Sequence, residues 1–355
     1  MVYILLLYFL LILSILLVGQ KQKWHKIAFL LLFFSACALI SGLRDVSVGI
    51  DTVTYHRMYH IYSNMRLSEI LRIYSYGVSF DIGYSILIKL CSFVYDDYYF
   101  FQLVISIIYY IGMARFFYHS TDDLFTASII FLGSGMFFYF FNVTRQMLAV
   151  IIVVNGWIDI NQKKRFRALL AIFVATTIHS SSIVFLIAYL ISLFRSNKKI
   201  LMIIPALILY IFINYQKVIS WVYNSFSVFD KYEKYIEGDE ILGIGNVYIV
   251  WMIVLFLSLY IIYRLKHFDG QDKIVAILSL IYVTCSLTGL KISYIDRIGL
   301  YFLPFIAPMF ISVKKSFKSD ELKLIYNIGL IIGFVAFYLH TGLTHEPSIY
   351  QFYFQ

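Results

Sequence analysis

The chain has 355 residues, of which 61% are apolar and 14% charged, and its mean hydropathy is +0.82. This composition excludes a soluble enzyme and indicates a membrane protein that crosses the bilayer several times. The net charge of +9 does not indicate nucleic-acid binding, because the basic residues stand in short connections between apolar runs, where they set the orientation of a membrane protein.

Apolar runs long enough to cross a hydrocarbon core of about 30 Å recur along the whole chain. In lipid every backbone polar group has to be paired within the protein, which only helices and closed barrels achieve. We expect these runs to be helices. We therefore expect an all-α protein with about twelve transmembrane helices in a single membrane domain over residues 1–355. The expected spans are roughly 1–19, 26–43, 98–117, 124–141, 145–161, 166–178, 180–194, 200–214, 246–263, 274–288, 298–313 and 323–340.

Clusters of lysine and arginine occur in alternate connections between these spans, which predicts that those connections face the cytoplasm. The alternation requires that residues 81–95 do not cross the membrane completely. Both termini and two long loops, at about 44–97 and 215–245, then face outward. Both loops mix aromatic and charged residues, which is typical of amphipathic helices that lie on a membrane surface.

The first polar cluster follows the second span, between Arg44 and Tyr55. Gly49 permits a turn, and a helix that begins at Asp51 would place Asp51 and Tyr55 on one face. Arg44 and Asp51 are therefore candidates to frame a pocket at the membrane surface. In the alternative interpretation, Arg44 extends to lipid headgroups and Asp51 only caps a helix.

The sequence predicts neither a metal nor a cofactor. Three cysteines each lie inside an apolar run, without the spacing of a disulfide framework or a ligand set. His56 and His60 have the i, i+4 spacing of a zinc pair, but no glutamate follows His56 and there is no obvious third ligand.

A second polar cluster, at residues 142–146, separates two apolar runs and includes Arg145 and Gln146. Facing lipid would be costly for these side chains, so we expect them to face the protein interior or a wet cavity. A helix that begins near Thr144 would add the partial positive charge of its N-terminus to that of Arg145, which predicts an anion site. The alternative is a tight turn between helices.

Three more polar residues are expected on the same outward side. His179 stands near the end of a span, where it either hydrogen-bonds a neighbouring helix or acts as a base. Asp296 and Arg297 lie in a later outward loop, as part of the site or as exposed loop charges.

Six short motifs follow one another over nearly the entire chain. They are Arg44 to Asp51 with Tyr55, Asp81-Ile82-Gly83-Tyr84, Arg145-Gln146 with Ala149, His179-Ser180, residues 232–236, and Arg297 with Tyr301-Phe302. In this order they resemble the EpsG/Wzy family of bacterial polysaccharide polymerases. The chain has Gly49-Ile50-Asp51 where the family more often has Gly-Thr-Asp, and Asp81 where it has a glutamate, and both changes keep the carboxylate.

The resemblance implies a GT-C-like glycosyltransferase in the bacterial cytoplasmic membrane, with its active site on the outer face. Such an enzyme transfers a growing glycan from one undecaprenyl-pyrophosphate carrier to another lipid-linked repeat unit, in O-antigen, capsule or exopolysaccharide synthesis. It would need no nucleotide, metal or cofactor. Its partners would be undecaprenyl-pyrophosphate-linked glycans, membrane lipids and a chain-length regulator, and no nucleic acid.

This reaction requires cations at the pyrophosphate and a base for the acceptor hydroxyl. A guanidinium pairs with phosphate through two hydrogen bonds and keeps its charge, so we assign pyrophosphate binding to Arg44, Arg145 and Arg297. His179 and Asp51 are alternative bases, and we favour His179 because histidine ordinarily titrates near neutral pH. The expected substrate-binding residues are Tyr55, Gln146, Asp81, Tyr84 and Asp296.

Three other functions remain open from the sequence. A ligase-type transferase would use the same donor, but such enzymes usually have one much larger outward loop. A flippase for lipid-linked oligosaccharides would show a repeat between its halves and cations along a central cavity. A membrane acyltransferase would use His179 as its base, but would need polar residues on the cytoplasmic side.

Overall fold

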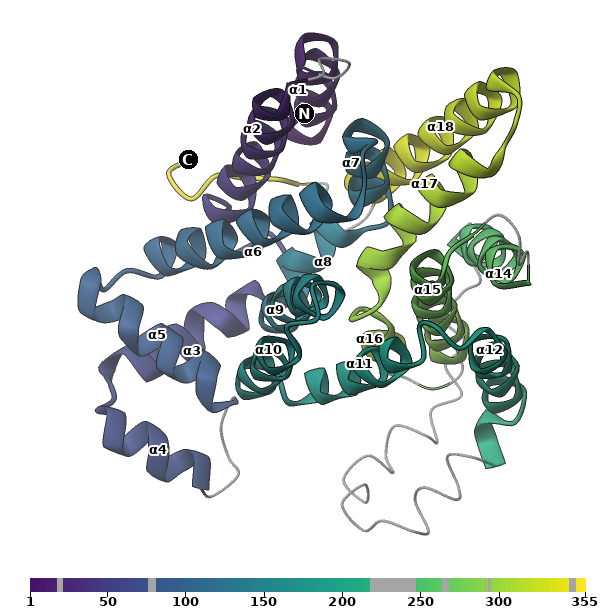
Figure 1. Ribbon diagram of the computed structural model, residues 1–355. Helices are drawn as coiled ribbons and strands as arrows, with labels where there is room; N and C mark the ends of the chain where they lie inside the picture. Colours follow the sequence, from purple (N-terminus) through teal and green to yellow (C-terminus); the bar gives the residue numbers. More distant parts are fainter. Residues whose placement is uncertain are drawn as a thin grey trace. The chain divides into compact units, whose positions relative to one another are not determined.

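The computed structural model describes residues 1–17, 22–75, 81–217, 247–263, 268–290, 292, 295–344 and 349–355. Within these residues every regular element is a helix, and the β pairing consists of one isolated bridge between Arg44 and Phe352. Contacts between Cα atoms divide the chain into two compact units: Met1–Ile183 with Ile325–Gln355, and Val184–Leu324. Each unit is described by itself below (Figure 1). A single membrane domain over residues 1–355 stays a prediction.

The first unit contains long, mostly apolar helices. They are α1 (Val2–Leu17), α2 (Lys23–Gly42), α6 (Tyr98–Ser120) and, from Ile325 on, α18 (Asp320–Thr344). The helices α2 and α6 pack tightly, because Gly42 has no side chain and a Cβ built there would lie 2.9 Å from the Cα atom of Leu103. Between them, the ring of Phe34 stacks on that of Tyr110 with centroids 6.2 Å apart, whereas Leu31 and Leu32 remain exposed on the surface of α2.

A bent helix pair follows α6. The helices α7 (Leu124–Gly133) and α8 (Met136–Asn142) meet at an angle of 43°. Gly135 sits at the bend with a φ of +84°, a left-handed conformation that glycine adopts without a steric cost. After α8 the chain forms α9 (Thr144–Asn161) and α10 (Arg165–Ile178), which lie side by side (Figure 1). The C-terminal end of α10 and the N-terminal end of α9 position the candidate site.

The expected outward loop at 44–97 contains three short helices: α3 (Thr52–Asn64), α4 (Leu67–Ser75) and α5 (Ile82–Val94). On α4, the exposed residues Leu67 and Leu71 are four positions apart and share one face, whereas Glu69 pairs with Arg66, the residue before the helix, at 2.7 Å. This helix is therefore amphipathic. The 13 residues of α5 extend about 20 Å, which is shorter than a hydrocarbon core. This length supports the expectation that residues 81–95 do not cross the membrane completely.

The second unit is built around α15 (Gly270–Gly289), the helix with the most buried side chains in this unit. The other helices are η1 (Ser180–Phe185) at the boundary of the units, α11 (Leu186–Leu193), α12 (Lys198–Ile213), α14 (Val247–Tyr263), α16 (Ile295–Gly299), η3 (Leu303–Phe305) and α17 (Ile306–Ser316). Among these, α12, α14, α16 and α17 pack on α15. The expected outward loop at 215–245 lies outside the described residues from position 218 on.

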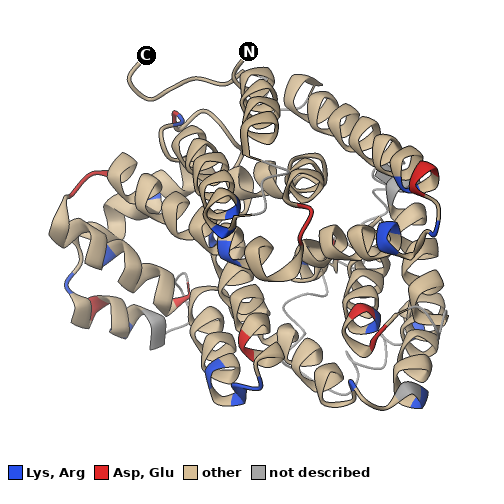
Figure 2. Ribbon diagram, turned by 45° about the horizontal axis from the view of Figure 1, so that its top comes forward, with Lys and Arg blue, Asp and Glu red and all other residues tan. Residues whose placement is uncertain are grey.

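Four of the described helices are long and apolar enough to cross a membrane: α2, α6, α15 and α18. The bent pair of α7 and α8 makes five if it is one span. Charged residues gather mostly at the ends of helices and in the connections (Figure 2). The protein is therefore a multi-pass membrane protein, and all regular elements in the described part of the chain are helices. Several further expected spans correspond to shorter apolar helices, such as α1, α12 and α14, so the count of about twelve stays a prediction.

Candidate functional site

Two polar side chains from distant parts of the sequence, those of His179 and Arg145, meet at the carboxylate of Asp81. One carboxylate oxygen of Asp81, Oδ2, lies 3.3 Å from Nδ1 of His179 and 3.6 Å from Nη1 of Arg145. The same oxygen accepts a hydrogen bond from the backbone N–H of Ser180 at 3.1 Å. The side chains of Asp81, His179 and Arg145 are 20%, 22% and 21% exposed, so the cluster is mostly buried and still open to a ligand.

Helix ends place these residues. Asp81 directly precedes α5, His179 directly follows α10, and Arg145 stands in the first turn of α9. Gly83 permits the contact between α5 and α10, because a Cβ built at Gly83 would lie 2.8 Å from the carbonyl carbon and oxygen of Thr177. The packing of α9 along α10 then brings Arg145 to the same end as His179.

The charge of Asp81 is stabilised by its neighbours. Burial by itself raises the pKa of the Asp81 carboxyl, but the hydrogen bond with His179, the charge of Arg145 and the N–H of Ser180 outweigh it and lower the pKa below its usual value. An ionised carboxylate only accepts hydrogen bonds, so Nδ1 of His179 carries the proton in this pair. In the neutral ring, Nε2 then has the free lone pair of a base, and within the described chain no hydrogen bond occupies it.

Three expected substrate-binding residues lie on the elements that carry this cluster or beside them. Gln146 follows Arg145 in α9 and is buried, and Tyr84 is buried in the first turn of α5. Tyr55, from α3, is half-buried, and its ring centroid lies 6.0 Å from that of Tyr84. The structure thus connects α3 to α5 through this aromatic contact.

The contacts of Arg44 indicate that this residue stabilises the fold. Its side chain is 1% exposed, and its guanidinium donates to the backbone carbonyls of Ser41, Val48 and Phe141 and lies 4.9 Å from the centre of the Phe141 ring. Burial lowers the pKa of Arg44. A guanidinium whose donors serve buried carbonyls is not available to a pyrophosphate, so the arrangement does not support the expected anion-binding role of Arg44. It fastens the turn after α2 to the end of α8.

Asp51 stands apart from the cluster in its contacts. It directly precedes α3, and its carbonyl accepts the N–H of Tyr55 at 3.0 Å, but its carboxylate forms no capping hydrogen bond. Gly49, with a φ of +102°, makes the turn that precedes it. The carboxylate of Asp51 has no hydrogen-bonding or ionic partner in the described part of the chain, so no second group orients it as a base.

Asp296 and Arg297 lie on the short helix α16 in the second unit, and both are exposed. Their predicted part in the site stays a prediction.

The histidine pair of α3 brings Nε2 of His56 within 3.2 Å of Nε2 of His60. Among the described residues there is no group of three or more histidine, cysteine or acidic side chains that could hold a metal ion.

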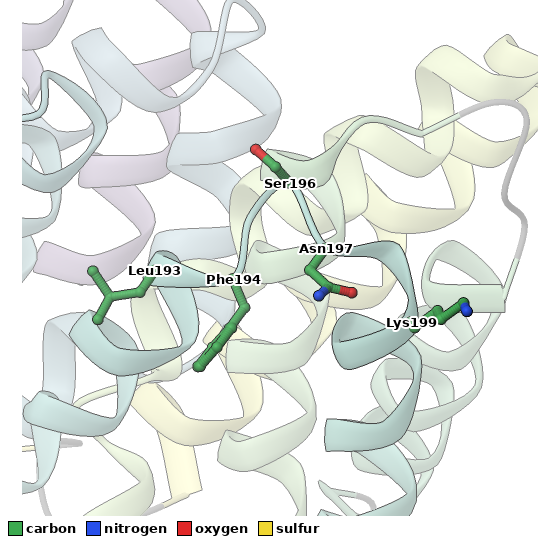
Figure 3. Close-up of a pocket in the computed structure, with 5 residues that line it drawn as sticks. All are labelled: Leu193, Phe194, Ser196, Asn197 and Lys199. Carbon is green, nitrogen blue, oxygen red and sulfur yellow. The ribbon is translucent and has the colours of Figure 1, made fainter.

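An open hollow of about 600 Å³ lies in the second unit, between the end of α11 and the start of α12 (Figure 3). It is lined by Leu193, Phe194, Ser196, Asn197 and Lys199. The side chain of Asn197 already accepts the N–H of Ile200 and caps α12. None of the predicted site residues lines this hollow.

The sequence placed Asp81 among the substrate-binding residues and did not predict its pairing with His179. The two residues are 98 positions apart, so no local spacing could reveal the contact. The one available signal was that both lie in short polar motifs at the ends of apolar runs.

The chain matches the model of the EpsG family over residues 26–354. Comparison with curated proteins found no match, and neither did comparison with solved structures. The matched range includes Asp81, Arg145 and His179.

Proposed function

The chain belongs to the EpsG family, and we propose that it is a polymerase in the exopolysaccharide synthesis with which this family is associated. In this proposal it has about twelve transmembrane helices in a GT-C-like arrangement. It joins undecaprenyl-pyrophosphate-linked oligosaccharide units on the outer face of the bacterial cytoplasmic membrane. The observation that carries the proposal is the contact of Asp81 with both His179 and Arg145.

His179 is the proposed general base. Its Nε2 removes the proton from the acceptor hydroxyl while that oxygen forms a bond to the anomeric carbon of the donor sugar. Asp81 holds the ring through Nδ1 and stabilises the imidazolium that forms, as the carboxylate does in other carboxylate–histidine pairs. This assignment is favoured over Asp51, whose carboxylate has no orienting partner among the described residues.

Arg145 is the proposed pyrophosphate ligand. The bond between the anomeric carbon and the pyrophosphate oxygen breaks, and its electron pair leaves with the lipid pyrophosphate. A guanidinium near this oxygen stabilises the charge that develops there. Because the pyrophosphate is already a good leaving group, the transfer requires no nucleotide. Arg297, on α16, is a second candidate ligand in this proposal.

The direct test uses purified protein and a synthetic undecaprenyl-pyrophosphate repeat unit, without nucleotide or metal, followed by separation of the products by size. Wild-type protein should produce a ladder, and His179→Ala should produce none. His60→Ala is the matched control, because His60 is an exposed histidine on α3, and it should leave the ladder unchanged.

Wild-type protein that forms no ladder but moves the labelled lipid across vesicle membranes would refute the polymerase and identify a flippase. Transfer of a single unit to a different acceptor, without repetition, would identify a ligase-type transferase.

A further inference from the structure

The C-terminal tail, residues 349–355, is fixed against the connection that follows α2. The N–H of Asp45 donates to the carbonyl of Gln351 at 2.9 Å, and the N–H of Tyr353 donates to the carbonyl of Leu43 at 3.1 Å. The hydroxyl of Tyr350 donates to the carbonyl of Ile40 at 2.7 Å. These bonds hold the tail in one place on the first unit.

Aromatic rings of the tail form a surface with the start of α6. The ring of Tyr353 stacks on that of Tyr99 with centroids 4.3 Å apart, and Phe352 stacks on Phe354 at 5.1 Å. Tyr353 and Phe354 nevertheless remain 42% and 63% exposed. We call these four residues, Tyr99, Phe352, Tyr353 and Phe354, the aromatic shelf.

Polar acceptors accompany the shelf. The carboxylate of Asp45 accepts the hydroxyl of Tyr99 at 3.3 Å and the N–H and hydroxyl of Ser47 at 2.9 and 2.7 Å. A carboxylate is costly in hydrocarbon, so its presence beside the rings argues against an anchor that enters the lipid. Exposed rings next to hydrogen-bonding groups suit a ligand with both apolar faces and hydroxyls, and a sugar has both.

The shelf is connected to the Asp81 cluster through the packing of α5 on α6. Tyr84, in the first turn of α5 after Asp81, has its ring centroid 5.8 Å from that of Phe101, which lies two residues after Tyr99 on α6. The reacting end of a glycan would lie at Asp81, and an earlier part of the same glycan would reach Tyr99 and Tyr353.

We propose that the aromatic shelf binds the growing glycan away from its reacting end and so retains it between additions. This inference rests on the proposed polymerase function. It assigns the last residues of the chain a substrate-binding role, with a polysaccharide as the ligand. Its consequence is specific: the shelf should affect the length of the product and not the formation of the first bond.

The test compares Tyr353→Leu with Tyr353→Phe in the purified polymerase assay. Tyr353→Leu should shorten the ladder severalfold and leave the rate of first-bond formation unchanged. Tyr353→Phe keeps the ring and should match the wild type. Tyr8→Leu, which alters a 60% exposed tyrosine on α1, is the control for an exposed aromatic residue in general.

A direct binding measurement completes the test. Glycan released from the lipid of the wild-type ladder should bind the Tyr353→Leu variant about fivefold more weakly than it binds the wild type, because one ring contact is lost.

Three results would overturn the inference. Tyr353→Leu with normal ladder length and normal glycan binding would reduce the shelf to a lipid contact, and the polymerase would stand because the wild type still forms a ladder. An equal loss of first-bond formation and of length would show that the tail only supports the fold. A wild-type protein without any ladder would refute the polymerase, and the shelf with it.

Discussion

Nδ1 of His179 lies 3.3 Å from Oδ2 of Asp81, although the two residues are 98 positions apart. The contact joins the end of α10 to the residue before α5. It turns the opposite ring nitrogen of His179 into the available base, and it places a carboxylate where an imidazolium would form. Substitutions that remove or separate the two residues of this contact should therefore reduce the rate of polymerisation.

Asp81→Asn should reduce the rate of polymerisation strongly while the protein remains folded. The amide has nearly the shape of the carboxylate, but it cannot stabilise a positive ring and does not fix the proton on Nδ1 of His179. We expect a loss of about 100-fold or more, within the usual range for general base catalysis. The measurement is the initial rate of first-bond formation with the synthetic lipid-linked unit. An activity within twofold of the wild type would remove Asp81 from the mechanism.

Gly83→Ala should separate Asp81 from His179 without changing either residue. A Cβ at position 83 would lie 2.8 Å from the backbone of Thr177, and backbone atoms cannot yield as a flexible side chain can, so α5 must shift away from α10. The variant should lose activity to about the same extent as Asp81→Asn. Gly329→Ala is the control, because nothing lies within 4 Å of a Cβ built there. Full activity in Gly83→Ala would show that the contact is not needed.

The two arginines should respond differently to lysine. Arg145→Lys keeps the charge but loses the planar fork, so the rate should fall with little change in stability. Arg44→Lys cannot serve the carbonyls of Ser41, Val48 and Phe141 together, and each buried carbonyl left without a donor costs about 1–3 kcal/mol. Its main effect should be a lower Tm in detergent. A normal Tm for Arg44→Lys, combined with a strongly reduced rate of polymerisation, would instead support pyrophosphate binding by Arg44.

The pH dependence of stability should reveal the ion pair. The pKa of Asp81 is lower in the folded chain than its usual value, so the carboxylate stabilises the fold fully above the unfolded pKa of about 4. This stabilisation is lost as the pH falls through the lower, folded pKa. The Tm of the wild type should therefore drop relative to that of Asp81→Asn as the pH falls below about 4. Parallel curves for the two proteins over this interval would contradict the ion pair.

Thiol labelling of intact spheroplasts tests the orientation. In a background without Cys37, Cys91 and Cys285, cysteine at Ser68 on α4 should react with a membrane-impermeant reagent, and cysteine at Lys318 should react only after lysis. Both positions are exposed, so accessibility within the protein does not limit either reaction. The reverse pattern would place Asp81 and the aromatic shelf on the cytoplasmic side.

The sequence by itself determined the setting and most of the candidate residues. Long apolar runs must be helical in lipid, because the bilayer offers no partner for backbone polar groups, and this constraint does not depend on the arrangement of the helices. For the same reason Arg145 and His179 could be recognised: a polar side chain at the end of such a run is costly unless it has a function or a partner. The match to the EpsG family over residues 26–354 is likewise a property of the sequence alone.

Only the tertiary structure decided which of these residues act together. Arg44 and Arg145 look equivalent in the sequence, yet one is buried against carbonyls and the other faces Asp81. The packing of α5 against α10, permitted by Gly83, makes Asp81 the partner of His179 and leaves Asp51 outside the pair. Contacts of this kind depend on distances between helices that are far apart in the chain, and hydropathy and residue spacing contain no information about them.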